Sequence, residues 1–119
     1  MQFIHEFMSS PVISLDGQAT AQEAGKLMCE KKISSILVKE GEEYVGIITK
    51  SDLVRRIVSE GLHPQSTSVG SIMSKPLLSL EQYTRRGEAY EYMREHNVKH
   101  LVVTLANEIV GIITLENMV

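Results

Sequence analysis

Residues 45–49 read Val45-Gly46-Ile47-Ile48-Thr49, and the same five residues return at 110–114 as Val110-Gly111-Ile112-Ile113-Thr114. At the same offset of 65 positions, Met8-Ser9-Ser10-Pro11 returns as Met73-Ser74-Lys75-Pro76. Aligned without a gap, residues 4–54 and 69–119 share 17 identities in 51 positions. The chain is therefore an internal duplication, and its two copies are expected to fold alike.

Each copy predicts the same order of short elements. In the first copy these are an extended piece, a helix, a two-stranded hairpin and a second helix, at residues 11–14, 20–32, 35–48 and 50–60. The first helix begins at a capping box, in which Glu23 follows Thr20 by three residues. Gly61 suits the end of the second helix. In the second copy, the pattern predicts a helix and two strands at residues 87–96, 101–104 and 109–113.

Helical spacing predicts which side chains of the two helices of the first copy are buried. These are Ala24, Leu27 and Met28 in the first helix, and Leu53, Val54, Ile57 and Val58 in the second. Three short strands and two helices leave one sheet face uncovered. We therefore expect an α/β (α+β) fold in which the two repeats pack sheet to sheet, with a pseudo-two-fold axis and a cleft on it. The first repeat is assigned to residues 1–61, the linker to 62–68 and the second repeat to 69–119, together one globular module.

Composition narrows the classes of function. The formal net charge is −3, which does not favour a nucleic-acid partner. The single cysteine, Cys29, can form no internal disulfide, and His5, His63 and His96 show no mutual spacing typical of metal ligands. No signal peptide is recognised, and the apolar runs are far shorter than the ~20 residues that span a bilayer. These features predict a soluble cytoplasmic protein without a metal or membrane.

The duplicated pattern resembles the CBS (cystathionine-β-synthase-type) domain pair, also called a Bateman module. Four stretches carry the resemblance, and the first and third recur in the second copy: Met8–Pro11, Ile33–Val38, Gly46–Leu53 and Asn97–Val103. The resemblance covers essentially the whole chain. It implies a non-catalytic regulatory module that binds AMP, ADP or ATP, with S-adenosyl ligands as an alternative. It also implies a homodimer that acts on an effector protein through a change in conformation or dimer packing.

The resemblance also assigns ligand contacts. Adenine is expected against the segments after each Met-Ser-x-Pro, which here are Val12-Ile13 and Leu77-Leu78. Basic residues before the second-copy strand, Lys99 and His100, are expected to reach phosphate. Their first-copy equivalents, Ser34 and Ser35, carry no charge. This difference predicts one site in which Lys99 and His100 act together with Thr49 of the first copy.

The segment between the second strand and second helix of the first copy holds the central candidates for ligand binding: Ile48, Thr49, Ser51 and Asp52. Backbone N–H groups at a helix start and the Thr49 hydroxyl can bind phosphate. The Asp52 carboxylate can accept from both ribose hydroxyls. Thr49 and Asp52 are equally typical of a helix cap, and the two roles are partly compatible.

In the second copy, Thr114 and Asn117 occupy the places of Thr49 and Asp52. An amide has one acceptor oxygen and no charge, so it should hold a ribose diol less well. We expect the Asp52 site to be occupied and the Asn117 site to be weak or empty. A ligand-independent dimerisation or interaction scaffold is the alternative function. No catalytic motif favours an enzyme.

Overall fold

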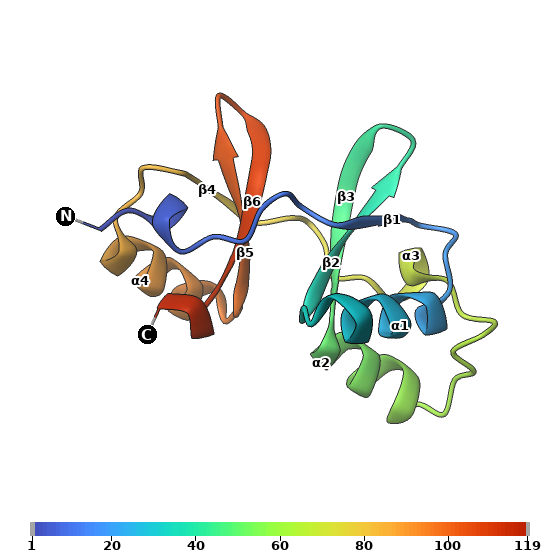
Figure 1. Cartoon of the computed structure of the whole chain (residues 1–119). Coiled ribbons are helices and arrows are strands. Elements are labelled where there is room, and N and C mark those ends of the chain that lie inside the picture. Colours follow the sequence, from blue (N-terminus) through green and yellow to red (C-terminus); the bar gives the residue numbers. More distant parts are fainter. Residues whose placement is uncertain (1, 119) are drawn as a thin grey trace. The chain divides into compact units, whose positions relative to one another are not determined.

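The computed structural model describes residues 2–118. The chain forms two compact units, each of which combines helices with a three-stranded sheet (Figure 1). The first-repeat unit comprises Ile13–Leu77, and the second-repeat unit comprises Met1–Val12 together with Leu78–Val119. The mixed α/β class and the duplication are confirmed. The assigned repeats follow the sequence, whereas the compact units divide the chain after residues 12 and 77.

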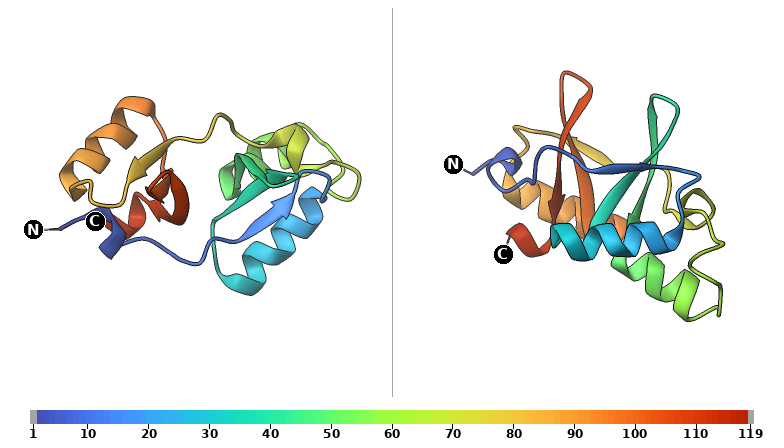
Figure 2. Two further views of the ribbon diagram at one scale, coloured as in Figure 1. Left: turned by 90° about the horizontal axis from the view of Figure 1, so that it is seen from above. Right: turned by 45° about the vertical axis from the view of Figure 1, so that its right-hand side comes forward.

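The first-repeat unit is built around the sheet β1-β2-β3. Its elements in chain order are β1 (Ser14–Asp16), α1 (Ala21–Lys31), β2 (Ser35–Glu40), β3 (Glu43–Thr49), α2 (Lys50–Asp52), the π-helix η2 (Leu53–Val58) and α3 (Val69–Ile72). β1 pairs with β2 in parallel, and β2 pairs with β3 antiparallel. Helix α1 runs beside the sheet (Figure 2), and its Ala24 and Met28 are buried in the core of the unit. They share a core with Ile36, Val38 and Ile48.

The second-repeat unit has the same plan. Its elements are the 3₁₀ turn η1 (Ile4–Glu6), β4 (Ser79–Glu81), α4 (Arg86–His96), β5 (His100–Leu105), β6 (Glu108–Thr114) and the 3₁₀ turn η3 (Glu116–Met118). β4 pairs with β5 in parallel, and β5 pairs with β6 antiparallel. The hairpin register shifts at equivalent places, after Val38 in β2 and after Val103 in β5. The duplication therefore extends to the details of strand pairing.

The Met-Ser-x-Pro segments complete the two sheets at their last strands. Ser9 and Ile112 exchange backbone hydrogen bonds of 2.8 and 3.0 Å, and Ser74 and Ile47 exchange bonds of the same lengths. The N-terminal segment thus pairs with the last strand of the second repeat (Figure 1). Ile4 in this segment is fully buried in the core of the second-repeat unit. For this reason the N-terminal segment belongs to the first repeat in sequence but to the second-repeat unit in space.

The first predicted helix of each copy is confirmed. The Thr20 hydroxyl accepts a hydrogen bond from the Glu23 N–H at 3.1 Å, so the predicted cap begins α1. In the second copy, α4 covers Arg86–His96, against a prediction of 87–96. Side-chain capping of this kind satisfies an N–H group that the helix itself leaves unpaired.

The second helix of the first copy differs from its prediction. Its first turn is α-helical, but residues 53–58 form a π-helix, with the Ser59 N–H bonded to the Val54 carbonyl at 2.8 Å. Bonds from i to i+5 place more residues in each turn, so the apolar spacing of an α-helix no longer selects one face. The prediction that Val54 and Val58 are buried is wrong, since they are 58% and 74% exposed. Gly61 follows with φ of 68°, in the left-handed conformation typical of a helix end.

Candidate functional site

The predicted ligand-binding residues of the first-repeat unit meet at the base of the β2–β3 hairpin. Ser35 of β2 lies opposite Thr49 of β3 in the strand register. The Lys50 N–H donates to the Ser34 carbonyl at 3.1 Å, which ties the start of α2 to the start of β2. Ser34, Ser35 and Thr49 are therefore neighbours around the first turn of α2.

Asp52 supplies the buried charge of this cluster, with a side chain 1% exposed. Its Oδ2 accepts hydrogen bonds from the Thr49 N–H at 2.9 Å and from the Thr49 hydroxyl at 3.0 Å. Its Oδ1 accepts from Nη2 of Arg55 at 3.2 Å and from the Ser74 hydroxyl at 3.0 Å. A carboxylate offers about four lone-pair positions, so these donors occupy all of them.

Thr49 and Asp52 form a reciprocal capping box. The Asp52 N–H donates to the Thr49 hydroxyl at 3.1 Å, while the Asp52 carboxylate accepts from the Thr49 N–H. The capping interpretation of this pair is therefore confirmed. Ligand binding by the pair stays a prediction. A ribose diol could bind Asp52 only if it replaced protein donors that already fill the acceptor positions of the carboxylate.

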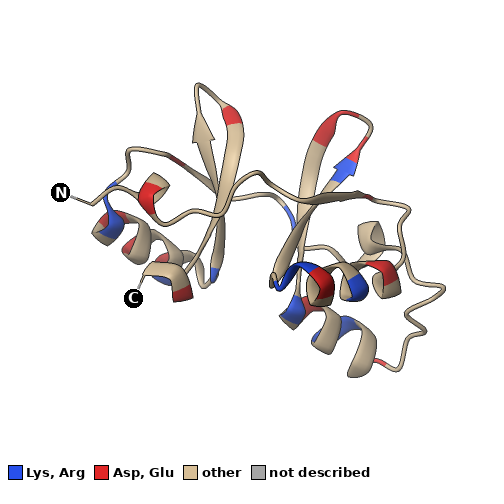
Figure 3. Cartoon of the chain, viewed as in Figure 1, with Lys and Arg blue, Asp and Glu red and all other residues tan. Residues whose placement is uncertain are grey.

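Arg55 compensates the Asp52 charge from the solvent side. A buried carboxylate without a partner is strongly unfavourable, so the 3.2 Å ion pair stabilises the closed arrangement. The Arg55 side chain is 66% exposed, so its guanidinium also has access to water. Figure 3 shows further Lys and Arg at the end of α1 and at the start of α2. This end of the first-repeat unit is suited to an anionic ligand.

The second-repeat unit contains the matching arrangement. His100 of β5 lies opposite Thr114 of β6, and the Leu115 N–H donates to the Lys99 carbonyl at 2.9 Å. Asn117 is exposed, and its side-chain oxygen accepts a hydrogen bond from the Thr114 hydroxyl. The predicted residues Lys99, His100, Thr114 and Asn117 thus come together within one unit. Their combination with Thr49, a residue of the other unit, stays a prediction.

The segments expected to face adenine run beside the central strands. The Ile13 carbonyl accepts from the Leu37 N–H at 3.0 Å, and the Leu78 carbonyl accepts from the Val102 N–H at 3.0 Å. Their neighbours Val12 and Leu77 are half-buried. One backbone acceptor in each segment is therefore already used by the sheet.

Two further predicted residues have clear positions. Ile48 is fully buried in the core of the first-repeat unit, because side chains alternate along β3 and its side chain points toward α1. A ligand contact by Ile48 is thereby limited to its backbone. Ser51 is exposed on the first turn of α2, beside the buried Asp52.

Ser74 is not among the residues that the sequence predicts for the site. Its hydroxyl bonds to Asp52 across 22 positions of sequence, a separation that no local motif reveals. The signal was present in the duplication, because Ser74 belongs to the repeated Met-Ser-x-Pro motif. The ion pair between Arg55 and Asp52 is a second contact that the sequence motifs do not predict.

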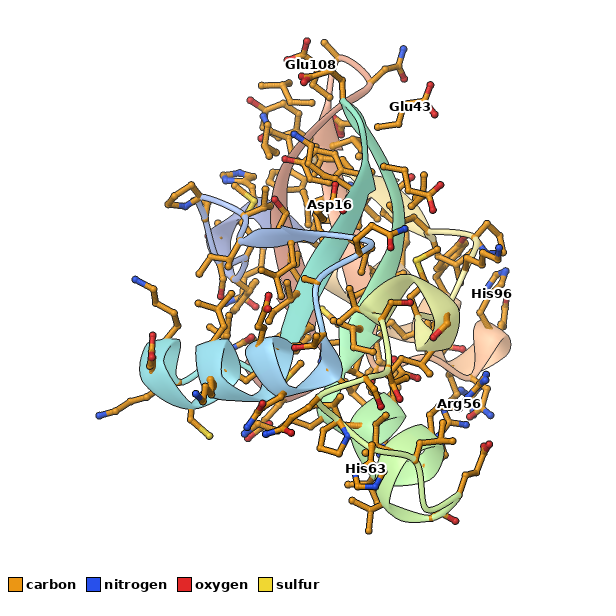
Figure 4. The ribbon with its side chains drawn as sticks, turned by 90° about the vertical axis from the view of Figure 1, so that its right-hand side faces the viewer. Asp16, Glu43, Arg56, His63, His96 and Glu108 are labelled. Atoms are coloured by element: carbon orange, nitrogen blue, oxygen red, sulfur yellow. The ribbon has the colours of Figure 1, made fainter. Side chains whose placement is uncertain are left out.

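A groove of about 700 Å³ lies between α1 and η2 of the first-repeat unit. Its lining residues are Ala21, Gln22, Gly25, Lys26, Cys29, Glu30, Leu53, Ile57, Val58 and Pro64. Exposed Val54 and Leu62 lie beside it in sequence. Arg56 and His63 project outward nearby (Figure 4). This surface is an apolar candidate for contact with another protein.

Metal clusters and membrane-spanning helices are both absent from the part of the chain that the structure describes. Within residues 2–118, no group of three or more His, Cys, Asp or Glu side chains is arranged to hold a metal ion. None of the helices that the structure describes is both long enough and apolar enough to cross a membrane.

The folded units and their matched sites agree with a known family. The family model of the CBS domain matches the chain twice, at residues 4–59 and 69–119. The chain therefore belongs to the CBS domain family, as a tandem pair of CBS repeats. This confirms the resemblance that the sequence motifs indicated.

Individual proteins and solved structures are similar to this chain over nearly its whole length. An uncharacterized protein of Methanopyrus kandleri is 32% identical over 97% of this chain, and the chain spans 60% of that protein's length. A solved structure of an uncharacterized conserved protein from Pyrococcus horikoshii is 32% identical, with a TM-score of 0.90 over 98% of this chain and 89% of that one. The hexameric CBS-CP12 protein from bloom-forming cyanobacteria is 26% identical, with a TM-score of 0.91 over 99% of this chain and 69% of that one.

Proposed function

We propose that this chain is a regulatory CBS pair that binds an adenosine nucleotide, AMP, ADP or ATP, with S-adenosyl ligands as the alternative. The observation that carries the proposal is the convergence of polar groups around Asp52 at the start of α2. Ser34, Ser35 and Thr49 lie around this turn, and Ser74 bonds to the carboxylate itself. Hydroxyl, amide and carboxylate groups gathered in this way suit a ligand with both a diol and a phosphate.

The roles within the first-repeat unit follow from chemistry. Asp52 is the acceptor for ribose hydroxyls, since a carboxylate forms stronger hydrogen bonds than a neutral acceptor. Ser51 presents an exposed hydroxyl on the first turn of α2 for phosphate, while the Thr49 hydroxyl keeps its donated bond to Asp52. Ile13 and Leu77 supply apolar side chains and backbone groups for the base. No residue of this set is proposed to catalyse a reaction, and the chain acts through occupancy alone.

Isothermal titration calorimetry and thermal unfolding with AMP, ADP, ATP and S-adenosylmethionine test this proposal. A ligand at a hundredfold excess over Kd should stabilise the fold by about 2.7 kcal/mol. Asp52→Ala is expected to weaken binding, and Asn117→Ala, its counterpart in the second repeat, is the matched control. Failure of all four ligands to bind at millimolar concentration would exclude nucleotide sensing and favour the interaction scaffold.

The groove between α1 and η2 supports a second proposal, that two copies of this chain associate through it. Gly25 and Cys29 are small residues on α1 that permit close approach, while Leu53, Ile57 and Val58 supply apolar surface. Lys26 and Glu30 line the same groove. In a two-fold contact, Lys26 of one copy can face Glu30 of the other, so the surface is self-complementary in charge. The hexameric state of the CBS-CP12 protein is in keeping with association of such pairs.

The mass in solution tests this association. Val58→Glu should shift the chain from dimer to monomer in sedimentation analysis, whereas Leu105→Glu, an exposed apolar residue on the hairpin of the second repeat, should leave the mass unchanged. Cys29 is the single cysteine. A bifunctional maleimide should therefore link two copies through it, and Cys29→Ser should abolish the link. A monomeric wild-type chain would exclude dimerisation.

A further inference from the structure

The Oδ1 atom of Asp52 is occupied by two side chains of the protein itself. Arg55 donates to it at 3.2 Å and Ser74 at 3.0 Å. The other oxygen, Oδ2, is held by Thr49 in the capping box that begins α2. Release of Thr49 would disrupt this cap, whereas release of Arg55 or Ser74 leaves the helix start intact. Freeing Oδ1 of its hydrogen-bond donors therefore costs less free energy than freeing Oδ2.

Ser74 is placed so that its side chain can leave without its backbone. The Ser74 backbone is fixed by two hydrogen bonds to Ile47, at 2.8 and 3.0 Å. Met73, the preceding residue, is 9% exposed and packs beside Gly46. Rotation about one side-chain bond suffices to move the Ser74 hydroxyl away from Asp52. The exposed Arg55 side chain can likewise exchange its bond for water.

We propose that Ser74 and Arg55 close the ribose-binding position of Asp52 in the free chain, and that a bound diol replaces them. This inference rests on the proposed nucleotide function and adds the residues that oppose binding. Ser74 and Arg55 are positioning residues that compete with the ligand for Oδ1. Affinity for a nucleotide is then the difference between the bonds that the diol forms with Asp52 and the bonds that these two residues lose.

Replacement of the Ser74 hydroxyl by a ligand would also change how the chain around Ser74 is held. Ser74 is attached to β3 through its backbone and to Asp52 through its hydroxyl. It lies three residues before Leu77, where the first-repeat unit ends. A bound diol removes the second attachment, so the segment that leaves this unit is held less firmly when ligand is present.

The second repeat offers a matched comparison. Ser9 forms the equivalent backbone pair with Ile112, at 2.8 and 3.0 Å. The residue in the place of Asp52 is Asn117, which is exposed and accepts from Thr114. Ser9→Ala therefore removes the equivalent hydroxyl from the same backbone setting. In this repeat the residue in the place of the buried Asp52 carboxylate is an exposed amide.

Calorimetry with AMP and its 2′,3′-dideoxy analogue tests the inference. Ser74→Ala should bind AMP about three- to tenfold more tightly than the wild type, the factor expected for one lost competing hydrogen bond. The dideoxy analogue, which cannot donate to Oδ1, should show no gain. Ser74→Thr, which keeps the hydroxyl, and Ser9→Ala should both retain wild-type affinity. Circular dichroism establishes that each variant is folded.

Arg55→Gln provides an independent variant, tested with adenosine so that loss of a positive charge near phosphate does not affect the comparison. It too should bind more tightly than the wild type. If Ser74→Ala and Arg55→Gln bind no more tightly than a wild type that does bind, the competition is wrong while nucleotide binding stands. If the wild type binds none of the four ligands, the proposed function and this inference both fail.

Discussion

The sulfur of Met73 lies over Gly46 of β3, so closely that a Cβ atom at Gly46 would come within 2.5 Å of it. Gly111 of β6 and Met8 repeat the contact at 2.6 Å. The backbone of neither glycine is left-handed, so close packing rather than conformation requires glycine at these positions. The two duplicated motifs, Met-Ser-x-Pro and Val-Gly-Ile-Ile-Thr, are thus packing partners in each unit.

Gly46→Ala is expected to destabilise the first-repeat unit by about 1–3 kcal/mol, because the new methyl group overlaps Met73 and the backbone of Ser74. Urea unfolding measures this change. Gly87→Ala is the control, since no atom lies within 4 Å of a Cβ at this position in α4. It should stabilise the helix by about 0.5–1 kcal/mol. Equal effects of the two variants would contradict the packing argument.

Ile4→Ala should destabilise the second-repeat unit although Ile4 belongs to the first repeat in sequence. Ile4 is fully buried, and loss of such a side chain costs about 2–5 kcal/mol. Hydrogen exchange should accelerate in β4, β5 and β6 before it does in the first-repeat unit. The exposed Gln2 provides the control, and Gln2→Ala should change stability by less than about 0.5 kcal/mol. Faster exchange confined to β1–β3 would contradict the assignment of this segment.

Asn117→Asp should create a second nucleotide site, because it restores the carboxylate that Asp52 supplies in the first repeat. The expected result is a rise in stoichiometry from one ligand to two in calorimetry. Asn117→Ala should leave one site. An unchanged stoichiometry in Asn117→Asp would show that the ribose acceptor is not what distinguishes the two repeats.

The family resemblance assigns Lys99 to phosphate, so Lys99→Ala should weaken AMP binding while adenosine binding stays the same. The loss should be about three- to tenfold and should shrink as salt is raised, because ionic strength screens the charge. Lys99→Arg, which keeps the charge, is the control. A similar loss for adenosine would indicate that Lys99 supports the fold rather than the phosphate.

Local sequence patterns predicted most of the helices and strands, but not in every case which side of a helix is buried. The cap at Thr20 depends on neighbours three residues away, and it formed as expected. Burial of Val54 and Val58 was predicted from α-helical spacing, and it failed because the helix changes to π geometry after Asp52. A change of helical period leaves no signal in apolar spacing alone.

The candidate site likewise contains residues that the sequence predicts and one residue that only the fold brings in. Thr49, Asp52 and the matching pair Thr114 and Asn117 follow from the duplication, because strand register and helix start are local properties of each copy. Ser74 reaches Asp52 only through the fold, across 22 positions of sequence. Its presence on the carboxylate changes the expected chemistry from an open acceptor to one that must be freed.

By itself, the sequence determined the duplication, the order of elements in each copy and the family, because all three depend on residues within one repeat. Only the tertiary structure decided which Met-Ser-x-Pro segment completes which sheet, and that Asp52 is buried under donors from Thr49, Arg55 and Ser74. These features arise from pairing between distant segments, whose partners are selected by packing of the whole unit rather than by any local preference.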